Sequence, residues 1–224
     1  MKDWHDTQNE EYLQLLRGRL REQRLLWVDQ FVSIVNRALQ DESFCQPRPT
    51  SLTINDYGCN VGHFFRGIPD IAHPTDYSGY DISETYLSIA RMSFGEHYFH
   101  LLDVADAKTD GILRSSNIAV VSATLEHIDY YDIALKNVFS RTTDLVIIRT
   151  FLGDISRSDR CTKHGARSSY LIRQFTVDEL TGIPLSLGWR YTQERDLATG
   201  GSARLVCNET SVPRRQTVLV FRKR

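Results

Sequence analysis

The 224-residue sequence lacks several features that would place it in a specialised class of protein. Its four cysteines form no CxxC pair, which argues against a thiolate zinc site and against a small disulfide-stapled scaffold. Thirteen glycines and six prolines are too few for a fibrous or low-complexity chain. No apolar run reaches the roughly 20 residues that cross a bilayer, and the polar start has no signal-peptide core. We therefore expect a soluble cytoplasmic protein without a membrane partner.

An excess of charge of one sign is also absent. Lys and Arg number 27 and Asp and Glu 28, which gives a formal net charge of −1. This balance provides no global attraction to nucleic acid or to an anionic membrane, so it argues against nucleic acid as a partner. The length and a hydrophobic content of 41% suffice for one globular unit with a sizeable core. Nothing in the sequence indicates an oligomeric state.

The first forty residues have a helical pattern. Apolar side chains recur every three or four positions, at Tyr12, Leu16, Leu20, Trp27, Phe31, Ile34 and Ala38. Four arginines lie between them, at positions 17, 19, 21 and 24. They suit either a solvated helix face or a cationic lid over an anionic substrate. Pro47 and Pro49 then end the helical pattern, so we predict an N-terminal helical cap at 1–49 and a main domain at 50–224.

Short apolar runs alternate with helical patterns after residue 50. The predicted strands are 52–56, 77–81, 99–103, 118–122, 145–149 and 217–221. One helix is expected to begin at Ser83 and another to contain Tyr131, Leu135 and Val138. A capping box formed by Thr176 and Glu179 predicts the start of a third helix. This alternation predicts an α/β fold with a mainly parallel sheet covered on both faces.

Glycines and aspartates gather where the first three predicted strands end. Gly58 and Gly62 follow the first strand, where they permit a sharp turn and the close approach of a ligand to the backbone. Asp81 ends the second strand, where its carboxylate can accept two hydrogen bonds from a ribose diol. Asp103 ends the third, within reach of an adenine amino group. Ligands of open parallel sheets bind at these carboxyl ends, and each acid would otherwise cost desolvation energy.

The region at about 50–155 resembles the class I S-adenosylmethionine (SAM)-dependent methyltransferases. The resemblance is carried by 56–62 (DYGCNVG) for the glycine-rich motif, 79–83 (GYDIS) for the ribose motif, 102–104 (LDV) for the adenine side and 123–128 (ATLEHI) after the fourth strand. It implies a doubly wound sheet of seven strands, the last antiparallel, and SAM as cofactor. Asn60 replaces a glycine that many members have, but asparagine tolerates left-handed backbone.

The resemblance also implies roles for individual residues. Asp56 would lie near the methionine end of the cofactor, above a floor formed by Gly58, Cys59, Asn60 and Gly62. Asp81 and Ile82 would hold the ribose, and Asp103 and Val104 the adenine. Thr124 and Leu125 would line the sulfonium side. A nicotinamide dehydrogenase is the nearest alternative with this architecture, but its G-x-G-x-x-G fingerprint lacks the second glycine here, and Asp56 would repel a pyrophosphate.

Glu126 and His127 are the candidate catalytic residues, because they follow the fourth strand beside the expected methyl position. Histidine has an unperturbed pKa near 6.5, so His127 is suited to removing a proton from a hydroxyl acceptor. A helix cap and packing against the cofactor are alternative roles for His127. Some members of the family that methylate RNA 3′ ends use a metal held by Glu-x-x-Glu-His. Ala123 replaces the first Glu of that set, although His164 is a candidate distant ligand, so we predict no metal site.

The segment from Phe151 to Gln174 is where acceptor specificity is expected. Its polar residues include Asp154, Arg157, Arg160, Lys163, His164, Arg167, Tyr170 and Arg173. These cations are suited to binding a carboxylate or phosphate group of the acceptor. They are also typical of a solvated loop. Tyr130 and Tyr131 are expected to pack the following helix, and either could touch the acceptor.

Together these features predict a SAM-dependent methyltransferase that modifies a small or medium-sized acceptor, most readily at oxygen. Two alternatives stay open at this stage. One is a metal-dependent RNA 2′-O-methyltransferase, and the other is a SAM-binding scaffold without turnover.

Overall fold

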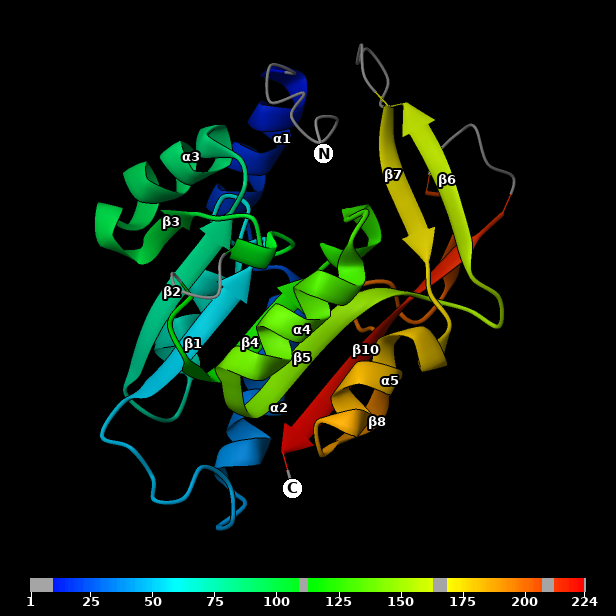
Figure 1. The fold of residues 1–224 in the computed structure, drawn as a ribbon. Coiled ribbons are helices and arrows are strands. Elements are labelled where there is room, and N and C mark those ends of the chain that lie inside the picture. The colour runs from blue at the N-terminus through cyan, green and yellow to red at the C-terminus, as the bar shows by residue number, and fades with distance from the viewer. Residues whose placement is uncertain (1–9, 109–112, 163–168, 207–211, 224) are drawn as a thin grey trace.

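A computed structural model describes residues 10–108, 113–162, 169–206 and 212–223 (Figure 1). Helices α1 (Glu10–Arg21) and α2 (Leu26–Leu39) come first, followed by β1 (Leu52–Tyr57), the 3-10 helix η2 (Phe64–Asp70), β2 (Thr75–Asp81) and α3 (Glu84–Phe94). Next come η3 (Glu96–Tyr98), β3 (Phe99–Leu101), β4 (Ser116–Ser122), η5 (Leu125–His127), α4 (Tyr131–Arg141) and β5 (Thr142–Leu152). The remaining elements are β6 (Arg157–Thr162), β7 (Ser169–Gln174), α5 (Val177–Ser186), β8 (Trp189–Arg195), β9 (Ala203–Arg204) and β10 (Arg214–Lys223).

The central sheet has the order β3-β2-β1-β4-β5-β10-β8, and the short β9 adds to the edge of β10. Strands β3, β2, β1, β4 and β5 pair in parallel, whereas β10 runs antiparallel to both β5 and β8. The chain order reverses between β1 and β4, which is the switch point where open α/β sheets bind ligands. This confirms the predicted doubly wound, mainly parallel sheet with an antiparallel last strand.

Helices cover both faces of the sheet. Helices α2 and α3 pack on one face, against the buried side chains of Ile54, Val120, Ile147 and Val218. Helices α4 and α5 pack on the other face, in front in Figure 1, against Val121, Ile148 and Phe221. Helix α2 therefore belongs to one of the two main helical layers, because its residues Val28, Phe31 and Val35 lie in the same core as the sheet.

Helix α1 is separate from these layers. The predicted helical region is broken between Arg21 and Leu26. Leu13 and Leu16 of α1 pack on Val61 of the glycine-rich turn and on Tyr86 and Ile89 of α3. Helix α1 thus lies against the segment that follows β1, at the carboxyl end of the parallel strands.

The two predicted helix starts that involve a capping side chain are confirmed. Ser83 caps α3 by accepting a hydrogen bond from the Tyr86 N–H, and Thr176 and Glu179 form the predicted capping box of α5. Local hydrogen bonds of this kind depend on residues three positions apart, so the sequence displays them directly. The element after the glycine-rich turn is the short 3-10 helix η2, which contains Pro69 and carries no side-chain cap.

The segment expected to act as an acceptor loop is largely a β-hairpin. Strands β6 and β7 pair antiparallel as a separate two-stranded sheet that stands off from the main sheet beyond β5 (Figure 1). Cys161 of β6 is disulfide-bonded, a covalent tie that the cysteine spacing did not indicate, whereas Cys45 and Cys59 are free thiols. Lys163, His164 and Arg167 lie outside the described residues.

Candidate cofactor and acceptor site

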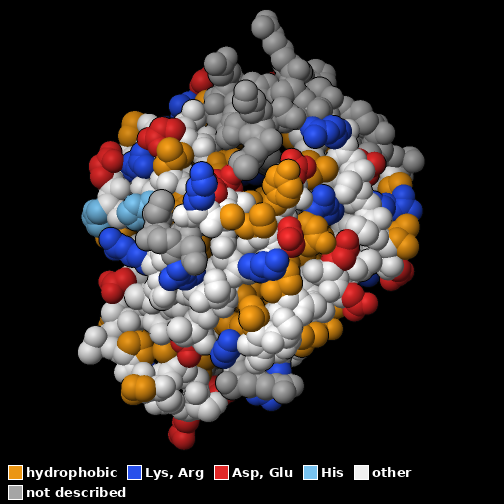
Figure 2. Space-filling view, viewed as in Figure 1, with side chains coloured by type: hydrophobic (Ala, Val, Ile, Leu, Met, Phe, Trp, Pro, Cys, Tyr) orange, Lys and Arg blue, Asp and Glu red, His pale blue; other side chains and the backbone are white. Residues whose placement is uncertain are grey.

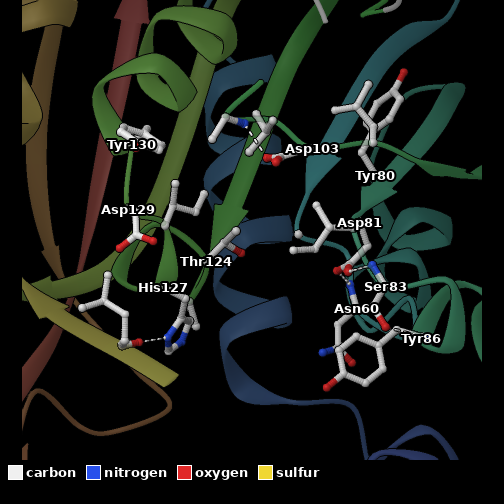
Figure 3. A pocket seen from close by; sticks show the side chains of 18 of the residues that line it. Asn60, Tyr80, Asp81, Ser83, Tyr86, Asp103, Thr124, His127, Asp129 and Tyr130 are labelled. Atoms are coloured by element: carbon white, nitrogen blue, oxygen red, sulfur yellow. Dashed lines mark hydrogen bonds between the residues drawn. The ribbon is translucent and has the colours of Figure 1, made fainter. Parts of the chain in front are cut away.

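A large cavity opens at the carboxyl ends of β1, β2 and β4 in the described part of the chain. It holds about 1080 Å³ of empty space, counting its opening to solvent. Figure 3 shows Asn60, Asp81, Ser83 and Tyr86 on one side and His127 and Asp129 on the opposite side, with Thr124 between them. We call these two sides the aspartate side and the histidine side. The cavity therefore lies at the switch point of the sheet.

The turn after β1 forms part of the cavity wall. Gly58 and Asn60 line the cavity, with φ angles of +74° and +54°. A Cβ at position 58 would overlap the side chain of Thr124, so this position requires glycine for space as well as for conformation. Asn60 adopts the left-handed conformation that we expected asparagine to tolerate in place of glycine. The turn therefore brings backbone to the edge of the cavity.

Asp81 is fixed on the aspartate side by the backbone around it. Its Oδ2 accepts a hydrogen bond from the Asn60 N–H, and its Oδ1 accepts one from the Ser83 N–H, both at 2.9 Å (Figure 3). This carboxylate joins the end of β2 to the turn after β1, and it lies at the cavity wall with Ile82 beside it.

Asp103 and Val104 lie further along the same wall. They follow β3 rather than ending it, because the strand stops at Leu101. The Oδ1 of Asp103 accepts a hydrogen bond from the Ala105 N–H at 2.9 Å, which turns the chain locally. Both predicted adenine-side residues therefore line the cavity, together with Leu102 and Ala105.

Several predicted site residues do not line the cavity. Cys59, Gly62 and Leu125 are buried. A Cβ at Gly62 would press against Phe99 and Phe94, so the lack of a side chain lets this turn pack closely on the core. The roles that the resemblance gave these residues toward the cofactor stay predictions.

Asp56 is also buried beneath the cavity. Its Oδ2 accepts a hydrogen bond of 2.7 Å from the Tyr77 hydroxyl, and only 3% of the residue is exposed. Burial raises the pKa of Asp56 to about 7, against the lowering effect of the Tyr77 hydrogen bond. The side chain therefore gains a proton far more readily than an exposed aspartate does.

His127 is oriented by a backbone carbonyl on the histidine side. Its Nδ1 lies 2.7 Å from the carbonyl oxygen of Leu171 in β7 (Figure 3). A carbonyl only accepts hydrogen bonds, so Nδ1 donates, and the lone pair of the neutral ring is then at Nε2. This is the tautomer that a base acting through Nε2 requires.

Glu126 does not reach the cavity. The residue is fully buried, and its Oε2 accepts a hydrogen bond of 2.8 Å from the Thr150 hydroxyl in β5. Burial raises the pKa of Glu126 to about 7, although Thr150 and Arg149 act in the opposite direction. In this arrangement Glu126 cannot act directly on an acceptor or contribute to a metal site in the cavity.

Two arginines of the hairpin, Arg160 and Arg173, have different surroundings. Arg160 lines the cavity. Arg173 packs instead over the rings of Tyr131 and Phe175, and it donates to the Ile128 carbonyl. Tyr130 is one of the cavity-lining residues, whereas Tyr131 packs on Phe175. In the described ranges no three His, Cys, Asp or Glu residues are grouped as a metal site.

Sequence reasoning assigned no individual site role to several residues that line the cavity: Tyr80, Ser83, Tyr86, Leu102, Ala105, Ala123, Ile128, Asp129 and Leu171. Five of them, Tyr80, Ser83, Leu102, Ala123 and Ile128, lie within the motifs that carry the resemblance, and Ala105 and Asp129 directly follow two of those motifs. Ala123 is different, because it adopts a positive φ of +52° beside the cavity. Leu171 reaches the site from the hairpin, and no sequence pattern around it predicts a position at the cavity.

Charges are mixed on the face of the molecule that Figure 2 shows. Lys and Arg side chains lie among Asp and Glu side chains, rather than in one continuous basic patch. Within the described residues no helix is both long enough and apolar enough to span a membrane.

No family model and no curated protein matches the sequence. Solved structures match the fold. DesVI from Streptomyces venezuelae is 14% identical, with both chains covered in full and a TM-score of 0.61. CalS10 from Micromonospora echinaspora, a SAM-bound amino pentose methyltransferase, is 13% identical over 95% of this chain and 96% of that one, with a TM-score of 0.61.

A third match is the magnesium protoporphyrin IX methyltransferase ChlM from Synechocystis PCC 6803 with bound SAM. It is 17% identical over 89% of this chain and 81% of that one, with a TM-score of 0.56. At such identities the likeness concerns the fold alone. The chain therefore has the Rossmann-like fold of the class I SAM-dependent methyltransferases, as the sequence resemblance predicted.

Proposed function

We propose that the protein is a SAM-dependent methyltransferase for a small-molecule acceptor. The observation that carries this proposal is the position of the Asp81 carboxylate, held at the end of β2 by the backbone of the glycine-rich turn. Asp103 lies further along the same wall of the cavity. A carboxylate at the end of β2 suits the ribose of an adenosine cofactor, and Asn60 in place of the second glycine of G-x-G-x-x-G argues against a cofactor with a pyrophosphate.

The residues that line the cavity around Asp81 match the successive parts of SAM. Asp81 and Ile82 would hold the ribose, Asp103 and Val104 the adenine, and Gly58, Asn60 and Thr124 the methionine portion. When bound, SAM supplies a methyl group that its sulfonium makes electrophilic. The chain itself must then orient an acceptor in line with that methyl group and exclude water.

We further propose oxygen as the methylated atom and His127 as the general base. The Nδ1 bond to Leu171 places the lone pair of the neutral ring at Nε2, which can remove the proton of a hydroxyl. The Arg160 side chain at the cavity wall suits an anionic group elsewhere on the acceptor. Fold does not determine the acceptor, so its identity rests on experiment.

The two alternatives gain no support from the geometry. The metal set of the RNA methyltransferases needs glutamates at positions 123 and 126 of this sequence, but position 123 is Ala and Glu126 is buried on Thr150. A scaffold without turnover gives no reason for His127 to be held in the tautomer of a base.

The test is a methyl-transfer assay with SAM that carries a labelled methyl group. Pools of small hydroxylated and carboxylated compounds serve as acceptors, and total RNA with Mg²⁺ serves as a separate pool. We expect S-adenosylhomocysteine (SAH) and a labelled small molecule. Labelled RNA would favour the first alternative. Cofactor binding without product from any pool would favour the scaffold, and absence of SAM and SAH binding would overturn the proposal.

A further inference from the structure

A buried arginine stands at the base of the β6–β7 hairpin, outside the cavity. Arg214 is the first residue of β10, and its side chain is fully buried. A guanidinium is costly to bury unless its N–H groups are bonded and its charge is balanced. The partners of Arg214 therefore show what this side chain holds in place.

Arg214 binds both strands of the hairpin. Its Nη1 donates to the Ile172 carbonyl of β7 at 2.7 Å, and its Nη2 donates to the Asp159 carboxylate of β6. Asp159 and Ile172 lie directly opposite each other in the hairpin. One planar guanidinium thus clamps a cross-strand pair and ties it to the end of the main sheet.

The neighbouring cross-strand pair reaches the cavity. Arg160 and Leu171 are opposite each other, one position along from the clamped pair, and both line the cavity. The Leu171 carbonyl is the acceptor for Nδ1 of His127. Arg214 and His127 therefore bind consecutive carbonyls of β7, so a shift of the hairpin at Ile172 would move the carbonyl that orients the histidine.

The carboxyl of Glu126 attracts the Arg214 guanidinium when it is ionised. The pKa of Arg214 is lowered mainly by burial, and Asp159 and Glu126 both act against that lowering. Glu126 Oε1 and Arg214 Nε also lack a hydrogen-bond partner among the described residues. A carboxyl beneath the histidine and a guanidinium beneath the hairpin thus share one buried region.

We propose that Arg214 is a positioning residue for the acceptor site. It fixes the β6–β7 hairpin so that Leu171 presents its carbonyl to Nδ1 of His127, which keeps the lone pair of the neutral imidazole at Nε2. This inference rests on the proposed role of His127 as a general base. A brace that only stabilised the fold would leave the tautomer of His127 unchanged, so the tautomer distinguishes the two roles.

The experiment measures the His127 tautomer by long-range ¹H–¹⁵N NMR of the imidazole nitrogens, at about pH 8.5, where an unperturbed histidine is neutral. His127→Gln identifies the His127 signals among those of the seven histidines. Urea-unfolded protein supplies the tautomer mixture of a free ring. Neither cofactor nor acceptor is needed, so this measurement can succeed or fail independently of the proposed function, which SAH titration tests separately.

The variants are Arg214→Met and the milder Asp159→Asn. The second removes the charge of one partner of the clamp and leaves an amide oxygen, which is a weaker acceptor for the guanidinium. Wild type is expected to be almost entirely the Nδ1–H tautomer. In both variants the Nδ1–H fraction should fall towards the unfolded value, with SAH affinity within about threefold of wild type. Arg222→Met is the matched control, because Arg222 lies on the same strand in an exposed pair with Asp41, and it should leave the tautomer unchanged.

An unchanged Nδ1–H fraction in a folded Arg214→Met variant would overturn the proposal. If that variant does not fold, an unchanged fraction in Asp159→Asn has the same meaning. A wild-type ring without the Nδ1–H preference would also overturn it, whatever SAH binding shows.

Discussion

The two sides of the cavity are held by different kinds of contact. On the aspartate side, Asp81 binds the N–H of Ser83, two residues away, and that of Asn60, 21 residues away across neighbouring strands. On the histidine side, His127 binds a carbonyl 44 residues away, and Arg214 binds one 42 residues away. The aspartate side is built from strand ends and their turns, whereas the histidine side depends on where a separate hairpin docks.

This difference explains how each side responds to change. Contacts made within a turn survive small movements of distant elements. Contacts to the hairpin require the whole β6–β7 unit to keep its position. Under the proposed function, we therefore expect the aspartate side to bind the cofactor without help from the hairpin, and the histidine side to set which acceptor is used. Each of the following changes affects one side and spares the other.

The largest effect is expected from His127→Ala. Removing a general base lowers turnover by about 100- to 10,000-fold, while SAH affinity stays within about threefold of wild type, because His127 lies on the opposite side from Asp81. Turnover is measured with the acceptor found in the methyl-transfer assay, and SAH affinity by calorimetry. Wild-type turnover in this variant would exclude the base role.

Gly58→Ala should damage the aspartate side by a steric route. A Cβ at a positive φ costs about 1–2 kcal/mol, and its overlap with Thr124 costs about 1–3 kcal/mol more. Stability against urea should fall by that sum, and SAH binding should weaken. Gly182→Ala is the control, because a Cβ there meets open space in helix α5, and it should be neutral or slightly stabilising. Equal effects of the two substitutions would contradict the assigned turn geometry.

Asp56 should impose a pH dependence on folding that the exposed acids do not. Its folded pKa of about 7 lies above the unfolded value near 3.9, so protonation favours the folded state. Stability is then full below about pH 4 and declines as the pH rises through 7. Asp56→Asn keeps an acceptor for the Tyr77 hydroxyl, and it should reduce the loss of stability between pH 5 and 8 by about 2–3 kcal/mol.

Urea unfolding at the two pH values measures this effect. Some decline should persist in the variant, because burial also raises the pKa of Glu126 to about 7. Asp76→Asn, an exposed position on the same strand, is the control and should leave the pH dependence of wild type. An unchanged slope in Asp56→Asn would show that Asp56 is ionised in the folded protein at neutral pH.

The same contrast decides how much could be predicted from the sequence. Six strands of the central sheet follow from patterns a few residues long, whereas β8 and β9 were not predicted. The capped helices and the cavity-lining residues Gly58, Asn60, Asp81 and Asp103 follow from such patterns too. The hairpin could not be predicted in this way, because its strands carry charged residues on an exposed surface and show no apolar alternation. Arg214 had no signal either, since a single arginine at the start of a strand is usually solvated.

The burial of Asp56 and Glu126 shows a further limit. A motif places a residue near a site, but it does not say on which side of the backbone the side chain lies. Both acids lie on the supporting side of the cavity wall, with Tyr77 and Thr150 as their partners. Only packing reveals this, because the neighbouring Gly58 and His127 line the cavity itself.

The central claim is that the aspartate side binds SAM through Asp81, and calorimetric titration of SAH tests it most directly. The titration compares wild type with Asp81→Asn and with the exposed control Asp76→Asn. We predict binding to wild type and to the control, with a loss of about 1–3 kcal/mol, or roughly 5- to 150-fold, in Asp81→Asn. Absence of binding to wild type, or equal affinity for wild type and Asp81→Asn, would contradict it.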